Sequence, residues 1–369
     1  MELFKDIWQI YRVNELRNRT WWWWWWLFVF KNPEEPDKEK QLMCLWGTRN
    51  SKKIWVDDYE WRRTAPPKDD DKGTSFQGVV AAWYFDGDKM HDPVLIDSGD
   101  GRIEGDDQEG FVSLKGDSGE YVCIGKKGGE EWSISLKDGN GNDIQASTTP
   151  YDPHQSKIIP TGKNYVGKLS YKMYKIKRCN CTGDIKLGGK NDGITDTGLE
   201  GTAYFQNVRI NSPTSPWYWA FLHSENGYYI DYFVPHFGLP MLRRRYKHKS
   251  PLDRGWKKLS RGFHIYDPEE GRDYRIKKFK VKQRYENDLP IFHLYGEEDG
   301  KRLDMEVTAY SRACWKIKQP WLGISSTILY YNEYPCHITK LDFRDGDKRI
   351  TLKDTGKVWG NCEHSWGIV

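Results

Sequence analysis

Two adjacent side chains near the C-terminus, Glu363 and His364, can donate or accept protons. They lie in the segment Trp359–Gly367 (WGNCEHSWG). If this segment is a strand, alternation places His364 and Trp366 on one face and Glu363 on the other. A histidine beside an indole can act as an acid or a base, or it can be held as a cation over the ring. The alternative interpretation is a closing strand with a hydrogen-bonded, structural histidine.

A second candidate segment has alternating aromatic residues that end in a histidine. In the sequence WYWAFLH, alternation places Trp217, Trp219, Phe221 and His223 on one face of a strand. A titratable group on an otherwise aromatic face is what a site for an apolar ligand needs. In the alternative interpretation, both indoles belong to the core and His223 is an ordinary hydrogen-bonded strand residue.

The turn after this strand decides which acidic residue the histidine can reach. Asn226–Gly227 predicts a two-residue hairpin turn, which would place His223 opposite Ile230. In that register Tyr232 shares the face of His223, and Asp231 points to the other face. This argues against a pair of His223 and Asp231, although one bulge in the turn would reverse the assignment.

Both segments resemble motifs of a known family. The segment Gly360–Gly367 is similar to a G-x-x-[DE]-H-x-W-G signature, and Trp217–Trp219 followed by Asn226–Gly227 is similar to a W-x-W strand. Both motifs belong to the carotenoid 1,2-hydratase (hydroxyneurosporene synthase) and AttH-like superfamily. The resemblance covers residues 198–235 and 359–367. It implies two lipocalin-like β-barrel domains and an activity related to isoprenoid hydratases, Diels-Alderase-type cyclases or, more distantly, tocopherol cyclase.

The order of the motifs departs from the family pattern. There the acid-histidine segment usually precedes the W-x-W strand, whereas here the clear copy ends the chain. The earlier segment 201–206 resembles the same position but has Gln206 where an acid is expected. The resemblance therefore supports a fold more strongly than a mechanism, because a fold does not determine a function.

The elements that must position these residues are strands. Runs such as Gly78–Phe85 are followed by turn residues such as Asp86–Asp88, a pattern typical of β-hairpins. Aromatic residues make up 15% of the chain, and they favour strands. Helical periodicity is confined to Leu3–Leu16. We therefore expect an all-β, antiparallel fold with a short N-terminal helix.

The ten consecutive apolar residues Trp21–Phe30 are too few for a membrane helix, which needs about 20. The aromatic and β-branched composition of this run predicts a strand that is buried on both faces. A bilayer-surface anchor is the alternative, because Trp favours membrane interfaces.

Stretches rich in Gly, Asp and Pro at Pro66–Gly73 and Gly183–Gly198 are expected to be loops or linkers. The second stretch predicts a boundary near residue 190. The chain would then consist of two lipocalin-like domains, residues 1–190 and 191–369.

Charge and cysteine content exclude several classes of function. The 57 basic and 53 acidic residues are interspersed, which indicates no nucleic-acid partner. Seven scattered cysteines do not form a disulfide framework, and the start lacks a secretion signal, so we expect a reducing, cytoplasmic location. The Cys179-x-Cys181 pair lacks zinc spacing, and we expect no metal and no cofactor. The basic run Met241–Lys249 is either a solvated loop or a contact for anionic lipid headgroups or a diphosphate.

Together these features predict a protein that holds an apolar isoprenoid or polyene in an aromatic-lined cavity and catalyses acid-initiated hydration or cyclisation of a C=C bond. The candidate acids and bases are Glu363, His364, His223, Asp231 and Glu200. The candidate lining residues are Trp217, Trp219, Tyr204, Trp366, Phe221 and Tyr232. Two alternatives are a non-catalytic lipid carrier and a carbohydrate-active β-sandwich whose carboxylates would be Glu200 and Asp231.

Overall fold

The computed structural model describes residues 2–13, 16, 20–164, 170–191, 193–211, 216–238, 256–321 and 325–368. The chain divides into two compact units. Unit 1 comprises Met1–Lys31, Lys40–Asp86 and His91–Pro213, and unit 2 comprises Asn32–Glu39, Gly87–Met90 and Thr214–Val369. Residues 191–213 thus belong to unit 1, although the sequence-based boundary near 190 places them in the second half.

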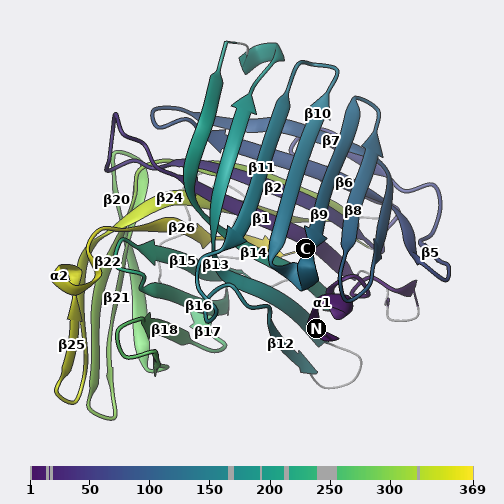
Figure 1. The fold of residues 1–369 in the computed structure, drawn as a ribbon. Helices are drawn as coiled ribbons and strands as arrows, with labels where there is room; N and C mark the ends of the chain where they lie inside the picture. Colours follow the sequence, from purple (N-terminus) through teal and green to yellow (C-terminus); the bar gives the residue numbers. More distant parts are fainter. Residues whose placement is uncertain are drawn as a thin grey trace. The chain divides into compact units, whose positions relative to one another are not determined.

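Unit 1 consists almost entirely of antiparallel strands (Figure 1). Short 3-10 turns occur at Lys127–Gly129 and Gly189–Asn191. The helix and strands are α1 (Glu2–Ile7), β1 (Trp21–Phe30), β2 (Lys40–Arg49), β3 (Lys53–Val56), β4 (Tyr59–Arg62), β5 (Lys68–Asp69), β6 (Gly73–Phe85), β7 (Met90–Gly105), β8 (Gly110–Gly116), β9 (Gly119–Lys126), β10 (Glu131–Asp138), β11 (Asp143–Pro150), β12 (Ile159–Asn164), β13 (Ser170–Lys186) and β14 (Thr195–Asn211).

The strands of unit 1 close into a barrel. Their order is β11-β10-β9-β8-β7-β6-β2-β1-β14-β13, and β13 pairs back with β11. The stretch Gly183–Gly198, expected as a loop or linker, comprises the end of β13, the start of β14 and the connection between them, and the two strands pair from Ser170–Asn211 to Lys186–Thr195. This pairing also holds residues 195–211 in unit 1.

The predicted strand Trp21–Phe30 is confirmed as β1, which lies between β2 and β14 (Figure 1). The side chains of Trp22, Trp24 and Trp26 point into the aromatic core of the barrel, and Trp25 is equally buried on the other face. A strand buried on both faces needs apolar residues at every position, which explains the uninterrupted run.

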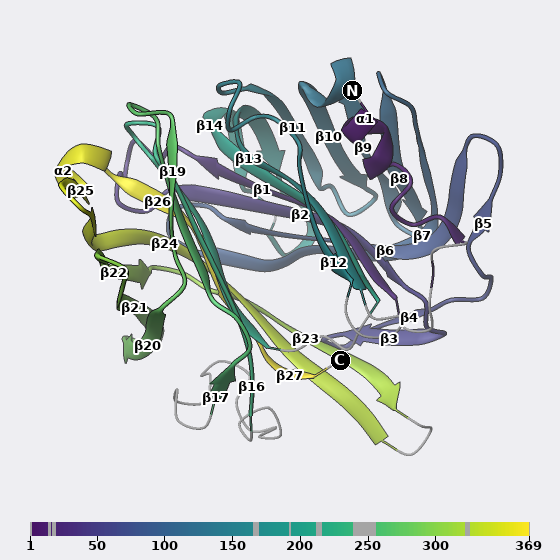
Figure 2. The same cartoon turned by 90° about the horizontal axis from the view of Figure 1, so that it is seen from below.

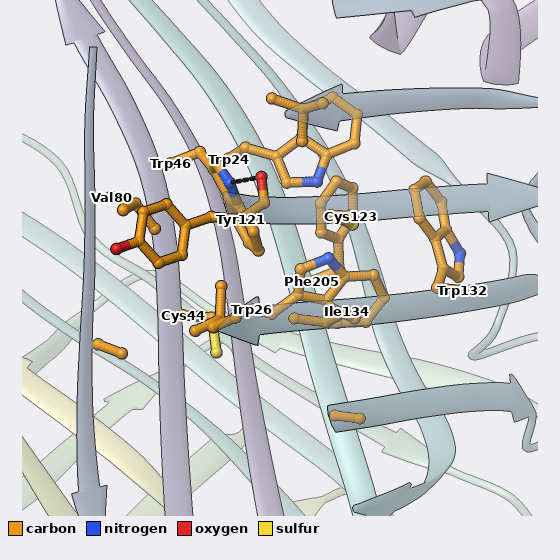
Figure 3. Packing of buried hydrophobic residues seen from close by; sticks show 14 of the residues in the cluster. Trp24, Trp26, Cys44, Trp46, Val80, Tyr121, Cys123, Trp132, Ile134 and Phe205 are labelled. Carbon is orange, nitrogen blue, oxygen red and sulfur yellow. Dashed lines mark hydrogen bonds between the residues drawn. The ribbon is translucent and has the colours of Figure 1, made fainter. Parts of the chain in front are cut away.

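Large side chains fill the barrel interior (Figure 3). The ring of Trp132 lies 5.2 Å from that of Phe205 and 5.4 Å from that of Trp26, between ring centroids. Burial of one such side chain stabilises a fold by about 1.5–3 kcal/mol, before any gain from ring geometry.

The N-terminal helix is shorter than the sequence pattern Leu3–Leu16 predicted, because α1 ends at Ile7. The indole of the following Trp8 packs on the face of the paired strands β7 and β8, over Gly105 and Gly110. A Cβ atom at Gly105 or Gly110 would lie within 2.4 Å of that indole, so only glycine allows this approach. Most apolar residues of the predicted helix are nevertheless buried, whereas Leu3 and Val13 are exposed.

Unit 2 is a second antiparallel sheet with one short helix (Figure 2). Its elements are β15 (Trp217–Ser224), β16 (Tyr229–Gly238), β17 (Trp256–Lys258), β18 (Gly262–Asp267), β19 (Arg272–Ile276), β20 (Phe279–Glu286), β21 (Leu289–Glu298), β22 (Lys301–Ala309), β23 (Ala313–Trp321), β24 (Ser325–Asp345), β25 (Lys348–Thr351), α2 (Leu352–Thr355), β26 (Val358–His364) and β27 (Trp366–Ile368).

The main sheet of unit 2 has the order β19-β18-β16-β15-β26-β24-β22-β21-β20. Its two outer strands, β19 and β20, are consecutive in sequence, and only Lys277 and Lys278 separate them. The two edges of the sheet therefore approach each other, and one face encloses an apolar cluster that includes Phe292 and Phe343. The predicted all-β, antiparallel fold is confirmed. In the described part of the chain, no helix is long and apolar enough to cross a membrane.

Candidate active site

The carboxyl group of Glu363 lies on the face of the unit 2 sheet that is opposite the apolar cluster. Strand β26 pairs with β15 on one side and with β24 on the other. Glu363 is directly opposite Trp219 of β15 and directly opposite Glu333 of β24. Because directly paired residues share a face, the three side chains form one row across three strands.

Two donors hold the Glu363 carboxyl group. The indole Nε1 of Trp217 donates to Oε2 at 2.6 Å, and the hydroxyl of Tyr331 donates to Oε1 at 2.8 Å. Trp315 packs against Tyr331, with 6.4 Å between the ring centroids. Glu363 is only 3% exposed, whereas Trp217 and Tyr331 remain partly exposed. A carboxyl group therefore lies just below a partly accessible aromatic surface.

Burial raises the pKa of Glu363 from its usual value near 4.5 to about 7. The hydrogen bonds from Trp217 and Tyr331 act in the opposite direction, because they stabilise the ionised form. A large fraction of this side chain is therefore a neutral carboxylic acid at neutral pH. It can both donate a proton and accept one back, which is the requirement for a general acid.

His364 points to the opposite face, as strand alternation predicted. Its ring stacks on Tyr218 with centroids 3.9 Å apart, and it lies 5.5 Å from the ring of Trp366. Its Nε2 atom is 3.4 Å from Nε2 of His236. Burial lowers the pKa of His364 well below its usual value and that of His236 to about 3, with nearby Lys258 adding to both effects. Both histidines are therefore neutral at physiological pH.

The prediction of a two-residue turn at Asn226–Gly227 is wrong. The amide of Ser224 donates to the carbonyl of Tyr228, and the Tyr228 amide donates to the Ser224 hydroxyl, so the connection is longer. His223 consequently lies opposite Tyr229 instead of Ile230. The prediction that Tyr232 shares the face of His223 is also wrong, because the one-residue shift reverses the faces of the second strand.

In the observed register Asp231 lies opposite Phe221 and shares the face of His223. This is the reversed assignment expected if the turn contained one extra residue. The carboxylate of Asp231 nevertheless approaches another histidine, with 3.6 Å between its Oδ1 and Nδ1 of His264. The Nε2 atom of His264 lies 2.6 Å from Oδ1 of Asp273. His223 is fully buried and packs between the rings of Phe221 and Tyr229.

The remaining candidates lie elsewhere. Glu200 is exposed on β14, and Tyr204 packs on Trp25, so both belong to unit 1. Tyr232 is buried in the apolar cluster of unit 2, and Trp366 packs on Tyr330. The structure thus brings Glu363, Trp217 and Trp219 together on one face of the unit 2 sheet, whereas Glu200 and Tyr204 belong to unit 1.

Sequence reasoning did not identify Tyr331, Glu333, Trp315 and His236. These residues come from β23, β24 and β16, and they reach Glu363 or His364 only through long-range strand pairing. One local signal exists. In YNEY, alternation places Tyr331 and Glu333 on one face of a strand, an aromatic next to an acid.

Several other sequence predictions concern sites away from this face. All seven cysteines are buried and unpaired. Within the described residues, no group of three or more His, Cys, Asp or Glu side chains is arranged to hold a metal ion. The basic run Met241–Lys249 lies outside the described residues.

Unit 1 has a pocket of about 360 Å³ near its β3–β4 turn. It is lined by Asp57, Tyr59, Asp138, Asn140 and neighbouring residues. The carboxylate of Asp138 accepts hydrogen bonds from its own turn, including the amide of Asn140 at 2.9 Å, and the Tyr59 hydroxyl is bonded to a serine. These polar groups are already used by the local structure.

Comparison with solved structures supports the architecture. The structure is similar to that of CghA, with a TM-score of 0.54 and 7% identity over 95% of this chain and 88% of that chain. The chain has the fold of CghA. A putative AttH from Nitrosomonas europaea gives a TM-score of 0.48 with 12% identity, over 94% of this chain and 92% of that chain. Kievitone hydratase from Nectria haematococca gives a TM-score of 0.41 with 9% identity, over 95% of this chain and 89% of that chain.

No protein-family model matches the sequence, and no curated protein matches it either. At such low identities the similarity concerns the fold. The function must therefore be argued from the side chains of the site.

Proposed function

We propose that this protein catalyses an acid-initiated addition to a C=C bond, either hydration or cyclisation, in an apolar isoprenoid or polyene, and that Glu363 is the proton donor. One observation carries the proposal. A buried carboxyl group with a pKa of about 7 is held by an indole and a phenol beneath a partly exposed aromatic surface.

The chemistry requires a strong enough acid in an apolar environment and a means of stabilising the cation that forms on carbon. Glu363 meets the first requirement, because burial keeps its proton in place until an acceptor arrives. Three indoles meet the second, because Trp217 donates to Glu363, Trp219 is directly opposite it and Trp315 packs on its other donor, Tyr331. An indole face stabilises a cation by about 0.5–2 kcal/mol, more when water is excluded.

The orientation of the neighbouring groups favours Glu363 over His364 as the acid. His364 faces the apolar cluster and pairs with His236. Its lowered pKa leaves it neutral, and a neutral imidazole is a poor proton donor to carbon. His364 instead packs on Tyr218, the neighbour of Trp217 in β15, and so stabilises the strand that carries the indole donor.

The test is transfer of deuterium to carbon. The protein would be incubated in D2O with geranylgeraniol or lycopene as probes, and products would be analysed by mass spectrometry. We expect deuterium at a carbon atom of the product, whether the reaction ends in hydration or cyclisation. Glu363→Gln should reduce the rate by about 10²–10⁴-fold, the usual contribution of a general acid.

The matched control is Glu297→Gln, which removes a carboxylate with 77% side-chain exposure from the same unit. It should leave deuterium transfer unchanged. Stoichiometric binding of either probe without deuterium transfer would contradict the proposal and indicate a carrier. Binding of oligosaccharides in preference to both probes would contradict it in favour of a sugar-binding protein.

A further inference from the structure

Glu333 is a second buried carboxyl group beside Glu363. It is 1% exposed and directly opposite Glu363 in the pairing of β24 with β26. Side chains at directly paired positions of antiparallel strands have Cβ atoms about 4.5–5.5 Å apart.

Tyr331 connects the two acids. It precedes Glu333 by two residues on β24, so both side chains lie on the same face. Its hydroxyl donates to Glu363 at 2.8 Å, and it also interacts with the Glu333 carboxyl group. When one of two neighbouring buried carboxyl groups is ionised, ionisation of the other is disfavoured, as in carboxyl pairs that share one proton.

Asn361 adds an independent observation. It precedes Glu363 by two residues on β26, shares its face, and is completely buried. Neither its Oδ1 nor its Nδ2 has a hydrogen-bond partner among the described residues. A buried amide of this kind destabilises the fold unless a small polar molecule forms hydrogen bonds with it. This position, beside both acids, suits a water molecule.

We propose that Glu333 is the base of the site, that it shares one proton with Glu363 through Tyr331, and that Asn361 binds the water molecule that adds to the substrate. The inference rests on the proposed function and deepens it, because it assigns the reaction to hydration. Glu333 would touch the reacting water and is therefore a second catalytic residue.

The proton balance of the reaction follows from this arrangement. Glu363 transfers its proton to one alkene carbon, which leaves a carbocation at the other. The oxygen of the water bonds to the cationic carbon, and the Glu333 carboxylate takes a proton from the resulting oxonium. Tyr331 then donates its hydroxyl proton to Glu363 and receives the proton from Glu333. Water has been added across the double bond, and both acids return to their starting states.

The first test needs no substrate. Infrared spectroscopy would follow the carbonyl band of protonated Glu363, identified as the band that is lost in Glu363→Gln. Glu333→Gln removes the neighbouring negative charge, so the titration of Glu363 should move to lower pH by about 1 unit or more. Tyr331→Phe removes a donor to the ionised form, so the titration should move to higher pH. Opposite shifts distinguish coupling from general damage to the fold.

An unchanged Glu363 titration in Glu333→Gln would overturn the inference, whether or not the protein converts an isoprenoid. Glu297→Gln serves again as the control and should not shift the titration.

The second test uses geranylgeraniol in H2¹⁸O. The wild type should form an alcohol that contains ¹⁸O, and Glu333→Gln should lower its formation by about 10²-fold or more. Asn361→Leu should lower it while leaving the Glu363 titration in place. A product that carries deuterium from D2O but never ¹⁸O would overturn the assignment to hydration and leave acid-initiated cyclisation standing. Absence of any turnover would instead refute the proposed function. The infrared titration of Glu363 would still decide whether the two acids share a proton.

Discussion

The barrel interior of unit 1 and the Glu363 face of unit 2 are built from the same aromatic residue types but place them in different surroundings. In the barrel, Trp132 packs against other rings and donates its indole N–H to the backbone carbonyl of Gly129. On the Glu363 face, Trp217 donates its indole N–H to a carboxyl group and keeps part of its ring exposed. The first arrangement fills space, whereas the second holds a proton donor.

This difference shows which observation separates a structural aromatic cluster from a reactive one. The barrel contains a long run of consecutive Trp residues, yet its central rings contact one another (Figure 3). Unit 2 has fewer Trp residues, but two of them, Trp217 and Trp219, lie beside a buried acid, and Trp315 packs on the tyrosine that donates to it. A polar group among aromatic rings is therefore more informative than the number of rings.

The comparison predicts its largest effect for a substitution in the barrel. Trp132→Ala should reduce the free energy of unfolding by about 3–5 kcal/mol, because it removes a fully enclosed side chain from among Trp26, Phe205 and their neighbours. Trp217→Ala removes a partly exposed indole and should reduce the free energy of unfolding by clearly less. Urea unfolding of both variants measures this, and equal losses would remove the distinction between the two regions.

The second prediction concerns the pH dependence of stability. Folding raises the pKa of Glu363 from near 4.5 to about 7, so the ionised form destabilises the native state. The contribution of Glu363 to the free energy of unfolding is complete below pH 4.5 and is lost as the pH rises through 7. The total loss is about 3 kcal/mol. Glu363→Gln should therefore be more stable than the wild type at pH 9 and nearly equal to it at pH 4.5. Unfolding midpoints across this range test the prediction, and parallel curves for the two proteins would refute it.

The smallest effect is expected for Trp217→Phe. This change keeps an aromatic ring but removes the N–H that donates to Glu363, a hydrogen bond that lowers the carboxyl pKa. The pKa should rise by about 1, which corresponds to about 1.4 kcal/mol. The pH profile of deuterium transfer should shift upward by the same amount. A downward shift would mean that the indole does not stabilise the carboxylate.

Local patterns predicted what depends on neighbouring residues along the chain. The composition and length of Trp21–Phe30 predicted a strand buried on both faces, and alternation placed Glu363 and His364 on opposite faces. Both features follow from the two-residue period of a strand and need no knowledge of its partners.

Features that depend on pairing were not predictable in the same way. The Ser224 side chain bonds to the Tyr228 amide and lengthens the hairpin turn, and this reverses the face of Asp231. Glu333 and Tyr331 reach Glu363 only because β24 pairs with β26, which no local pattern specifies.

The most direct test of the account is the protonation state of Glu363 in the wild-type protein. Infrared difference spectra between the wild type and Glu363→Gln, recorded from pH 5 to pH 9, isolate the carbonyl band of this side chain. The account predicts a protonated carboxyl group at pH 6 that loses its proton with a midpoint near pH 7. A carboxylate already fully ionised at pH 6 would contradict the assignment of Glu363 as the proton donor.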